Sequence, residues 1–253
     1  MNSRSNQLRV ALCQLRMNWT GDENTTSIVQ QLSLASANGA SICLFPELAV
    51  TGIHRRIAQA AVPELVYDWM EQVRLACIGN TIATSVGAPT FTPEGKIRIS
   101  QHVLNEDGET VGVVHKRGLT APEATFFEPG AQRPTIELVG RSWSAMICRE
   151  IDDSVQIADE LAHNMPEIVL WPGGLRPDPD KPRTDPPEHV RTAQTFARDC
   201  GVFVVMVNWP NALNRPEESA EAGSSVVINP AGEILLTLPK AEAGMALFTL
   251  GES

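Results

Sequence analysis

The chain has 253 residues, of which 43% are hydrophobic, and its 20 basic and 30 acidic side chains give a net charge of −10. This length suits one large domain or two small ones with a sizeable core. The acidic balance argues against nucleic-acid binding, which needs clustered Lys and Arg. The five Cys residues are odd in number and form no CxxC pair, which excludes a complete disulfide framework and argues against a Cys-rich zinc site.

The sequence predicts a soluble, cytoplasmic protein without a membrane partner. No apolar run approaches the roughly 18 residues that a membrane helix needs. The opening residues, MNSRSNQ, lack the apolar stretch of a signal peptide. Scattered Cys residues are compatible with reduced thiols in the cytosol.

The first half of the chain predicts alternating strands and helices, followed by a hairpin. Short apolar runs rich in β-formers are typical of buried strands. They cover 8–14, 41–45, 81–87, 97–104 and 110–115. We expect one helix to be capped by Asn24-Thr25 and to end at Gly39, and a second to open at Pro63. The run from Asn105 to Gly108 predicts the hairpin turn.

The second half repeats this order of elements. Its expected strands cover 143–148, 167–171, 202–208, 224–229 and 234–238. One helix is expected after Ser154, and another after the capping-box-like Asp185-Pro186-Pro187-Glu188, ending at Gly201. The turn from Asn229 to Gly232 mirrors the turn of the first half.

This repeated order predicts internal pseudo-symmetry. Helical crossovers between strands imply sheets covered by helices, so the two halves are expected to pack sheet to sheet with helices outside. We treat 1–253 as a single domain because no flexible linker separates the halves. Two segments break the regularity: 172–187, with six prolines, and the acidic 209–223. Both are compatible either with surface loops or with functional lids.

Three residues with reactive side chains follow predicted strands: Glu47, Lys116 and Cys148. In open α/β sheets, functional groups gather beyond the carboxyl ends of strands. Each residue also has a simpler explanation: a loop cap, a solvated strand end and a small buried hydrophobic residue. The polar run from Arg149 to Asp153 favours chemistry at Cys148, since Arg149 and nearby backbone N–H groups favour a thiolate.

Seven segments in order carry a family resemblance. They are LRVALCQ (8–14), GASICLFPELAVTG (39–52), VVHKRGL (113–119), FFEPG (126–130), SAMICREID (144–152), FARDCGVFVVMVN (196–208) and SSVVINPAGEIL (224–235). Together they cover nearly the whole chain, and the combination of FPEL-x-x-TG with a later strand-end Cys is specific. The chain resembles the nitrilase superfamily of carbon–nitrogen hydrolases.

The resemblance implies an α/β fold, a four-layer α-β-β-α sandwich, with a triad of Glu47, Lys116 and Cys148. Glu123 matches an additional Glu that many members have near the Lys. Glu128 is a weaker match for that role, because it lies inside FFEPG, where members vary, and a surface position is expected for it. In the implied chemistry, Glu47 takes the thiol proton, Cys148 forms a thioester, and Lys116 with the Arg149 backbone N–H stabilises the oxyanion. This chemistry needs no metal or organic cofactor.

The sequence departs from the family pattern near the pocket. Arg149-Glu150 follows the Cys where many members have an aromatic residue and Asp, or Trp and Glu, which is compatible with a charged substrate or with an outward side chain. Trp171 stands where many members have an Asn-Pro-Ser-like stretch. Trp171 either lines the substrate pocket or belongs to the core.

The first functional hypothesis is a cysteine amidohydrolase that cleaves a non-peptide amide of a small molecule and releases ammonia or an amine. The alternatives are an N-carbamoyl amine hydrolase, a nitrilase and a catalytically silent binding member. The absence of Trp directly after Cys148 weakens the nitrilase alternative, and an N-acyltransferase would carry membrane spans that this sequence lacks. The resemblance also implies a homodimer or larger homo-oligomer, with the helices in 154–164 and 185–200 as the candidate contact face.

Overall fold

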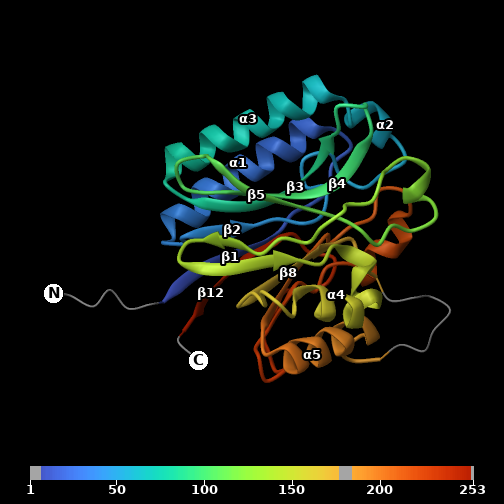
Figure 1. The fold of residues 1–253 in the computed structure, drawn as a ribbon. Coiled ribbons are helices and arrows are strands. Elements are labelled where there is room, and N and C mark those ends of the chain that lie inside the picture. The colour runs from blue at the N-terminus through green and yellow to red at the C-terminus, as the bar shows by residue number, and fades with distance from the viewer. Residues whose placement is uncertain (1–6, 177–183, 252–253) are drawn as a thin grey trace.

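The computed structural model describes residues 7–176 and 184–251. Within them, two six-stranded sheets pack against each other. Helices α1 (Gly21–Ala37) and α3 (Pro63–Asn80) cover the outer face of the first sheet, and α4 (Ser154–Leu161) and α5 (Glu188–Cys200) cover that of the second (Figure 1). This is the expected four-layer α-β-β-α sandwich. A short helix, α2 (Ile57–Ala60), precedes α3.

The two sheets share one topology, which confirms the predicted pseudo-symmetry. The first has the order β12 (Gly244–Leu250), β1 (Leu8–Gln14), β2 (Ile42–Leu44), β3 (Ala83–Phe91), β4 (Ile97–Leu104), β5 (Thr110–His115). The second, in the matching direction, has β6 (Ile136–Leu138), β7 (Arg141–Ala145), β8 (Ile168–Gly173), β9 (Phe203–Asn208), β10 (Val226–Ile228), β11 (Ile234–Thr237). In each sheet, strands two to four are parallel and the others are antiparallel to their neighbours.

The two hairpin turns repeat the symmetry in detail. The side-chain oxygen of Asn105 accepts hydrogen bonds from the backbone N–H of Asp107 and Glu109, at 3.1 and 2.8 Å. Asn229 makes the same pair of bonds two and four residues further on, again at 3.1 and 2.8 Å. Side-chain bonds of this kind are the reason Asn favours turns.

Strands buried on both faces create three apolar layers. In β1, Val10 and Leu12 point between the sheets, while Ala11 and Cys13 point toward α1 and α3. The equivalent outer layer of the second sheet lies beneath α4 and α5. Sheets covered by helices on one face and by another sheet on the other require nearly continuous apolar strands, which explains why β1 reads as one apolar run.

Some predicted boundaries were wrong. Helix α1 begins at Gly21 with Thr20 as its N-cap, and Asn24 instead accepts a hydrogen bond from the Asn18 backbone N–H. Pro187, not Asp185, precedes α5, without a side-chain cap bond. The strand predicted for 143–148 ends at Ala145, and the edge strands β6 and β12 were missed. The latter is stabilised by pairing with β1 along its whole length, and its partly exposed side chains show no clear alternation.

Candidate active site

Glu47, Lys116 and Cys148 come together where the ends of the two sheets meet. Glu47 lies in the turn after β2, and Lys116 directly follows β5 in the same sheet. Cys148 follows β7 of the second sheet and opens the 3₁₀ helix η2 (Cys148–Asp153). The structure therefore brings together three residues that are distant in sequence.

Lys116 is held between two carboxylates. Its Nζ lies 2.7 Å from Glu47 Oε1 and 2.6 Å from Glu123 Oε1. The side chains of Lys116 and Glu47 are 0% and 1% exposed, whereas that of Glu123 is 20% exposed. Glu123 opens the short 3₁₀ helix η1 (Glu123–Thr125), and its other oxygen accepts a hydrogen bond from the Thr120 backbone N–H. The pairing predicted for Glu123 with Lys116 is present.

The turn that carries Glu47 is packed tightly from two sides. A Cβ on Gly87 of β3 would lie 2.3 Å from the Leu48 backbone nitrogen, so a glycine is required there. On the other side, the Trp209 indole N–H donates to the Glu47 backbone carbonyl at 2.9 Å. Trp209 is 1% exposed, so the segment 209–223, which is compatible in sequence with a surface loop or a lid, begins with a buried residue. That loop contains the 3₁₀ helix η3 (Pro216–Glu221).

Cys148 sits on a strained turn. Its φ of 55° lies in the left-handed region, which is uncommon for residues other than glycine and is concentrated at functional sites. The Trp171 indole N–H donates to the Cys148 backbone carbonyl at 2.9 Å. Trp171 is 0% exposed and packs in the layer beneath α4 and α5. This placement favours the core alternative over the predicted substrate contact, and the indole supports the Cys148 turn from the side of α4 and α5.

Glu47, Lys116 and Cys148 influence one another's pKa values. Burial raises the pKa of Glu47, although the Lys116 ammonium and a hydrogen bond with Cys148 oppose this shift. Burial also raises the pKa of Cys148 to about 12, reinforced by the Glu47 charge and opposed by Lys116 and the Gly174 backbone N–H. Burial acts to lower the pKa of Lys116, but Glu47, Cys148 and Glu123 outweigh it and the pKa is raised. The resting thiol is therefore protonated at neutral pH, with a carboxylate beside it.

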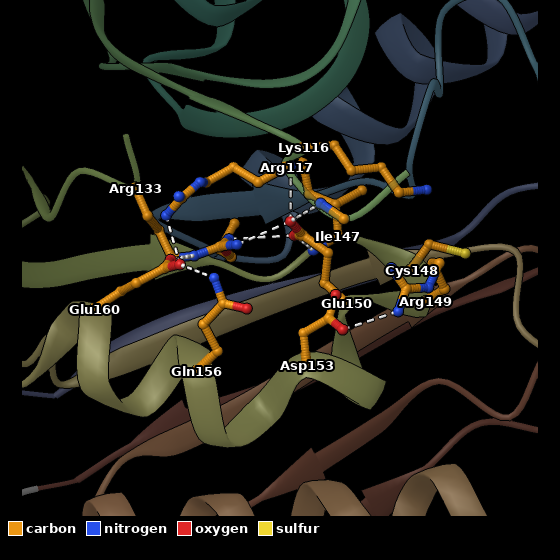
Figure 2. A network of polar contacts seen from close by, with 12 residues as sticks. Lys116, Arg117, Arg133, Ile147, Cys148, Arg149, Glu150, Asp153, Gln156 and Glu160 are labelled. Atoms are coloured by element: carbon orange, nitrogen blue, oxygen red, sulfur yellow. Dashed lines mark hydrogen bonds and ion pairs between the residues drawn. The ribbon is translucent and has the colours of Figure 1, made fainter. Parts of the chain in front are cut away.

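Arg149 and Glu128 lie outside this charge cluster. The Arg149 guanidinium is paired with Asp153 at 2.9 Å, as Figure 2 shows. The substrate contact predicted for residue 149 therefore rests on its backbone N–H. Glu128 is 41% exposed and pairs with Lys96 at 3.4 Å. This agrees with the surface position suggested for Glu128.

A cavity of about 260 Å³ is lined by Gly174 and by Trp209, whose indole N–H donates to the Glu47 carbonyl. Glu47, Lys116, Glu123 and Cys148 are not among its lining residues. The remaining lining residues are Met17, Ile53, Arg176, Asn211, Ala212, Leu213, Asn214, Arg215, Glu218 and Ala222. Arg176 belongs to the proline-rich segment and pairs with Glu218 at 3.2 Å. The described N-terminal part of 172–187 and the segment 209–223 thus form part of the cavity wall, whereas 177–183 lie outside the described residues.

Metal-binding clusters and membrane-spanning helices are both absent from residues 7–176 and 184–251. Within them, no group of three or more His, Cys, Asp or Glu side chains is arranged to hold a metal ion. In the same part of the chain, no helix has the length and apolar character needed to cross a membrane.

Comparison with known proteins identifies the family. The model of the carbon-nitrogen hydrolase family matches residues 9–251. The chain belongs to the carbon–nitrogen hydrolase family. Its relationship to the nitrilase superfamily, predicted from the seven segments, is thereby confirmed.

Solved structures of this family share the fold. The amidase from Nesterenkonia sp. AN1, as a double mutant in complex with acrylamide, superposes with a TM-score of 0.84 at 24% identity, over 100% of this chain and 94% of that chain. Another structure of that amidase carries the acetamide moiety of fluoroacetamide, added covalently at the active site cysteine. It superposes with a TM-score of 0.83 at 25% identity, over 99% of this chain and 93% of that one.

A longer relative matches over part of its length. The glutamine-dependent NAD(+) synthetase of Acinetobacter baylyi is 24% identical over an alignment of 233 residues, and the match covers 86% of this chain. The chain spans only 39% of that relative, so the match concerns one portion of the synthetase.

Proposed function

We propose that this carbon–nitrogen hydrolase cleaves the amide bond of a small molecule, with Cys148 as nucleophile. The observation that carries the proposal is the buried Lys116, held by Glu47 and Glu123 beside a thiol on a strained turn. A protonated thiol needs a nearby base before it can attack a carbonyl carbon. Burial raises the pKa of Glu47, and Cys148 is among the groups that influence it, which suits a residue that accepts and returns a proton.

The reaction proceeds in two steps. Glu47 takes the thiol proton as the Cys148 sulfur bonds to the amide carbon, and the carbonyl oxygen gains the negative charge of a tetrahedral intermediate. Lys116 and the backbone N–H of Arg149 stabilise this oxyanion. Glu47 then gives its proton to the nitrogen, the C–N bond breaks, and ammonia or an amine leaves a thioester on Cys148.

Water completes the cycle. Glu47 accepts a proton from a water molecule, whose oxygen attacks the thioester carbon. The C–S bond breaks, the carboxylic acid is released, and the proton returns to the Cys148 sulfur. Glu123 keeps the Lys116 ammonium in place through its 2.6 Å contact. Glu47 carries each proton that moves: the thiol proton leaves with the nitrogen product, and a proton from water restores the thiol.

The cavity supports a small substrate. Its volume of about 260 Å³ is slightly below the roughly 300–1,000 Å³ of sites for drug-sized ligands. A double mutant of the similar amidase is in complex with acrylamide, and another mutant carries the acetamide moiety of fluoroacetamide at its active site cysteine. Short-chain amides are therefore the first candidates. Glutamine is a further candidate substrate, because a longer relative is glutamine-dependent.

The test is a panel of short amides, glutamine, ureido acids and nitriles, read by ammonia release. We expect amides to be turned over and a thioester on Cys148 to be trapped by acid quenching and mass spectrometry. Cys148→Ala should reduce turnover by roughly four orders of magnitude or more and should keep the fold, as judged by circular dichroism. Turnover of ureido acids or nitriles alone would replace the amidase assignment, and activity retained in Cys148→Ala would refute the nucleophile.

A further inference from the structure

The Glu150 carboxylate lies beside the candidate site, is buried, and accepts hydrogen bonds on both of its oxygens. It is 1% exposed and accepts five hydrogen bonds (Figure 2). Its Oε1 accepts from the backbone N–H groups of Arg117 and Gly118, at 2.8 and 3.0 Å, and from Arg133 Nη2 at 2.8 Å. Its Oε2 accepts from the Ile147 backbone N–H at 2.5 Å and from Arg133 Nη1 at 3.2 Å.

These bonds join the two segments that carry the reactive side chains. Ile147 precedes Cys148 in the second sheet, and Arg117 and Gly118 follow Lys116 of the first. The approach of the two segments is close: a Cβ on Gly118 would lie 2.4 Å from Asp153 Oδ2 and 3.1 Å from Glu150 Cγ. A single carboxylate therefore spans the junction between the two sheets next to the site.

Arg133 holds this carboxylate ionised. Its side chain is 2% exposed, and besides Glu150 it contacts the Ala145 carbonyl at the end of β7. Burial alone would raise the pKa of Glu150, but the Arg133 charge and the N–H donors lower it. An ionised carboxylate accepts shorter and stronger hydrogen bonds than a neutral group. Glu160 of α4 forms the outer end of the network, paired with Arg133 at 3.2 Å and Arg117 at 2.5 Å.

We propose that Glu150, held by Arg133, is a positioning residue that fixes the Cys148 turn relative to Lys116. In Figure 2 the Cys148 sulfur points away from the Glu150 carboxylate, so Glu150 acts through the backbone and does not touch the reacting atoms. The catalytic consequence rests on the proposed function, because it assumes that Cys148 and Lys116 act on the same carbonyl group.

The test compares Glu150→Gln with Glu160→Gln. Both changes remove a negative charge that faces Arg133. Only Glu150 accepts hydrogen bonds from the backbone of both segments, whereas Glu160 contacts the Lys116 segment through the Arg117 side chain alone. In Glu150→Gln the new NH₂ group faces N–H donors, so one segment loses its acceptor. We expect kcat for the best amide to fall roughly 10- to 100-fold with KM within about threefold, since a misplacement near 1 Å costs about that much. Glu160→Gln should stay within about threefold of the parent enzyme in both parameters.

A second readout is independent of the substrate. Alkylation of Cys148 by iodoacetamide can be followed by mass spectrometry across pH. Its rate should be about tenfold lower in Glu150→Gln than in the parent protein and unchanged in Glu160→Gln. If the parent protein hydrolyses no amide, the proposed function fails while this readout still tests the positioning role. Equal alkylation and equal kcat in the two variants would overturn that role.

Two more variants separate positioning from stability. Removing both charges with Glu150→Gln and Arg133→Met avoids an unpaired buried charge, so thermal stability should recover while kcat stays low. Recovery of kcat together with the melting temperature would overturn the proposal. Arg133→Lys keeps a positive charge opposite Glu150 but loses the bidentate contact. We expect a kcat between those of the parent enzyme and Glu150→Gln. A kcat equal to that of the parent enzyme would also contradict the proposal.

Discussion

Lys116 and Glu47 are 69 residues apart in the sequence, yet Lys116 Nζ lies 2.7 Å from Glu47 Oε1 and neither side chain is more than 1% exposed. A buried ammonium is tolerated only when opposite charges compensate for lost hydration. Glu47 and Glu123 provide this compensation. The same arrangement places a positive charge and a base side by side next to Cys148, and the predictions below rest on it.

Turnover should be lost in acid at a higher pH than an ordinary glutamate would give. Glu47 must be ionised to accept the thiol proton, and burial raises its pKa from the ordinary value of 4.5. As pH falls through this raised pKa, Glu47 becomes protonated and kcat/KM declines. A pH profile of kcat/KM on a neutral amide measures the acid limb. An acid limb at or below 4.5 would contradict the role of Glu47 as base.

Breaking the buried pair should cost both activity and stability. Lys116→Met leaves two carboxylates facing each other, and we expect a loss of about 3–5 kcal/mol in unfolding free energy and a fall of about 10²–10³ in kcat. The exposed pair of Lys96 and Glu128 at 3.4 Å is the matched control, and Lys96→Met should cost less than about 1 kcal/mol. Urea denaturation of both variants gives the comparison, and equal losses would refute the electrostatic argument.

Catalytic losses at Glu47 and Lys116 should not add. Glu47→Gln alone should reduce kcat by about 10²–10⁴-fold. Because the two residues act on one bond rearrangement, the double variant with Lys116→Met should be little worse than the poorer single variant. A kinetic double-mutant cycle measures the coupling. Strictly additive losses would indicate that the two residues serve separate steps or sites.

Cys148 should alkylate faster than Cys200, and only while Glu47 is intact. Cys13, Cys43 and Cys77 are fully buried, whereas Cys148 and Cys200 are partly exposed. The pKa of both partly exposed thiols is raised, with burial as the main cause, but Cys148 has a base beside it. Glu47→Gln should slow labelling at Cys148 and leave the internal control Cys200 unchanged. Peptide mapping after limited iodoacetamide treatment gives both rates from one sample.

The charged rim of the cavity should affect acidic substrates. Arg176, from the proline-rich segment, lines the cavity and is paired with Glu218, whereas Arg183 of the same segment lies outside the described residues. Arg176→Ala should raise KM for acidic amides roughly tenfold, as expected for loss of a charge-assisted hydrogen bond, with neutral amides of equal size unaffected. Glu218→Gln should lower KM for the same acidic amides, because it frees Arg176. Parallel changes for both substrate classes would exclude charge reading.

The predicted homo-oligomer should pair through α4 and α5. Val155 on α4 is 79% exposed, a position that a partner subunit would cover. Val155→Glu should shift the molecule toward a monomer in light scattering at micromolar concentration. Leu75→Glu on α3, where the side chain is 53% exposed, is the control on the opposite outer layer and should leave the oligomer intact. A monomeric parent protein would refute the assembly prediction.

The sequence by itself determined the layers of the fold and predicted three candidate site residues. Apolar runs such as the one at 8–14 predicted strands because sheets covered on both faces exclude polar side chains, and β1 has those bounds. Glu47, Lys116 and Cys148 were candidates because each follows such a run, and the family resemblance implied that they form a triad. The turn residues Asn105 and Asn229 were identifiable because their side chains bond to the local backbone.

Only the tertiary structure decided which of these groups meet and what supports them. Glu150 reads locally as one more charge in a polar run, and its five hydrogen bonds come from three separate segments. Trp209 and Trp171 could not be assigned because each serves a residue that is distant in sequence, Glu47 and Cys148. Strand periodicity records burial, which is a local property, whereas hydrogen bonds across the two sheets depend on how the sheets pack.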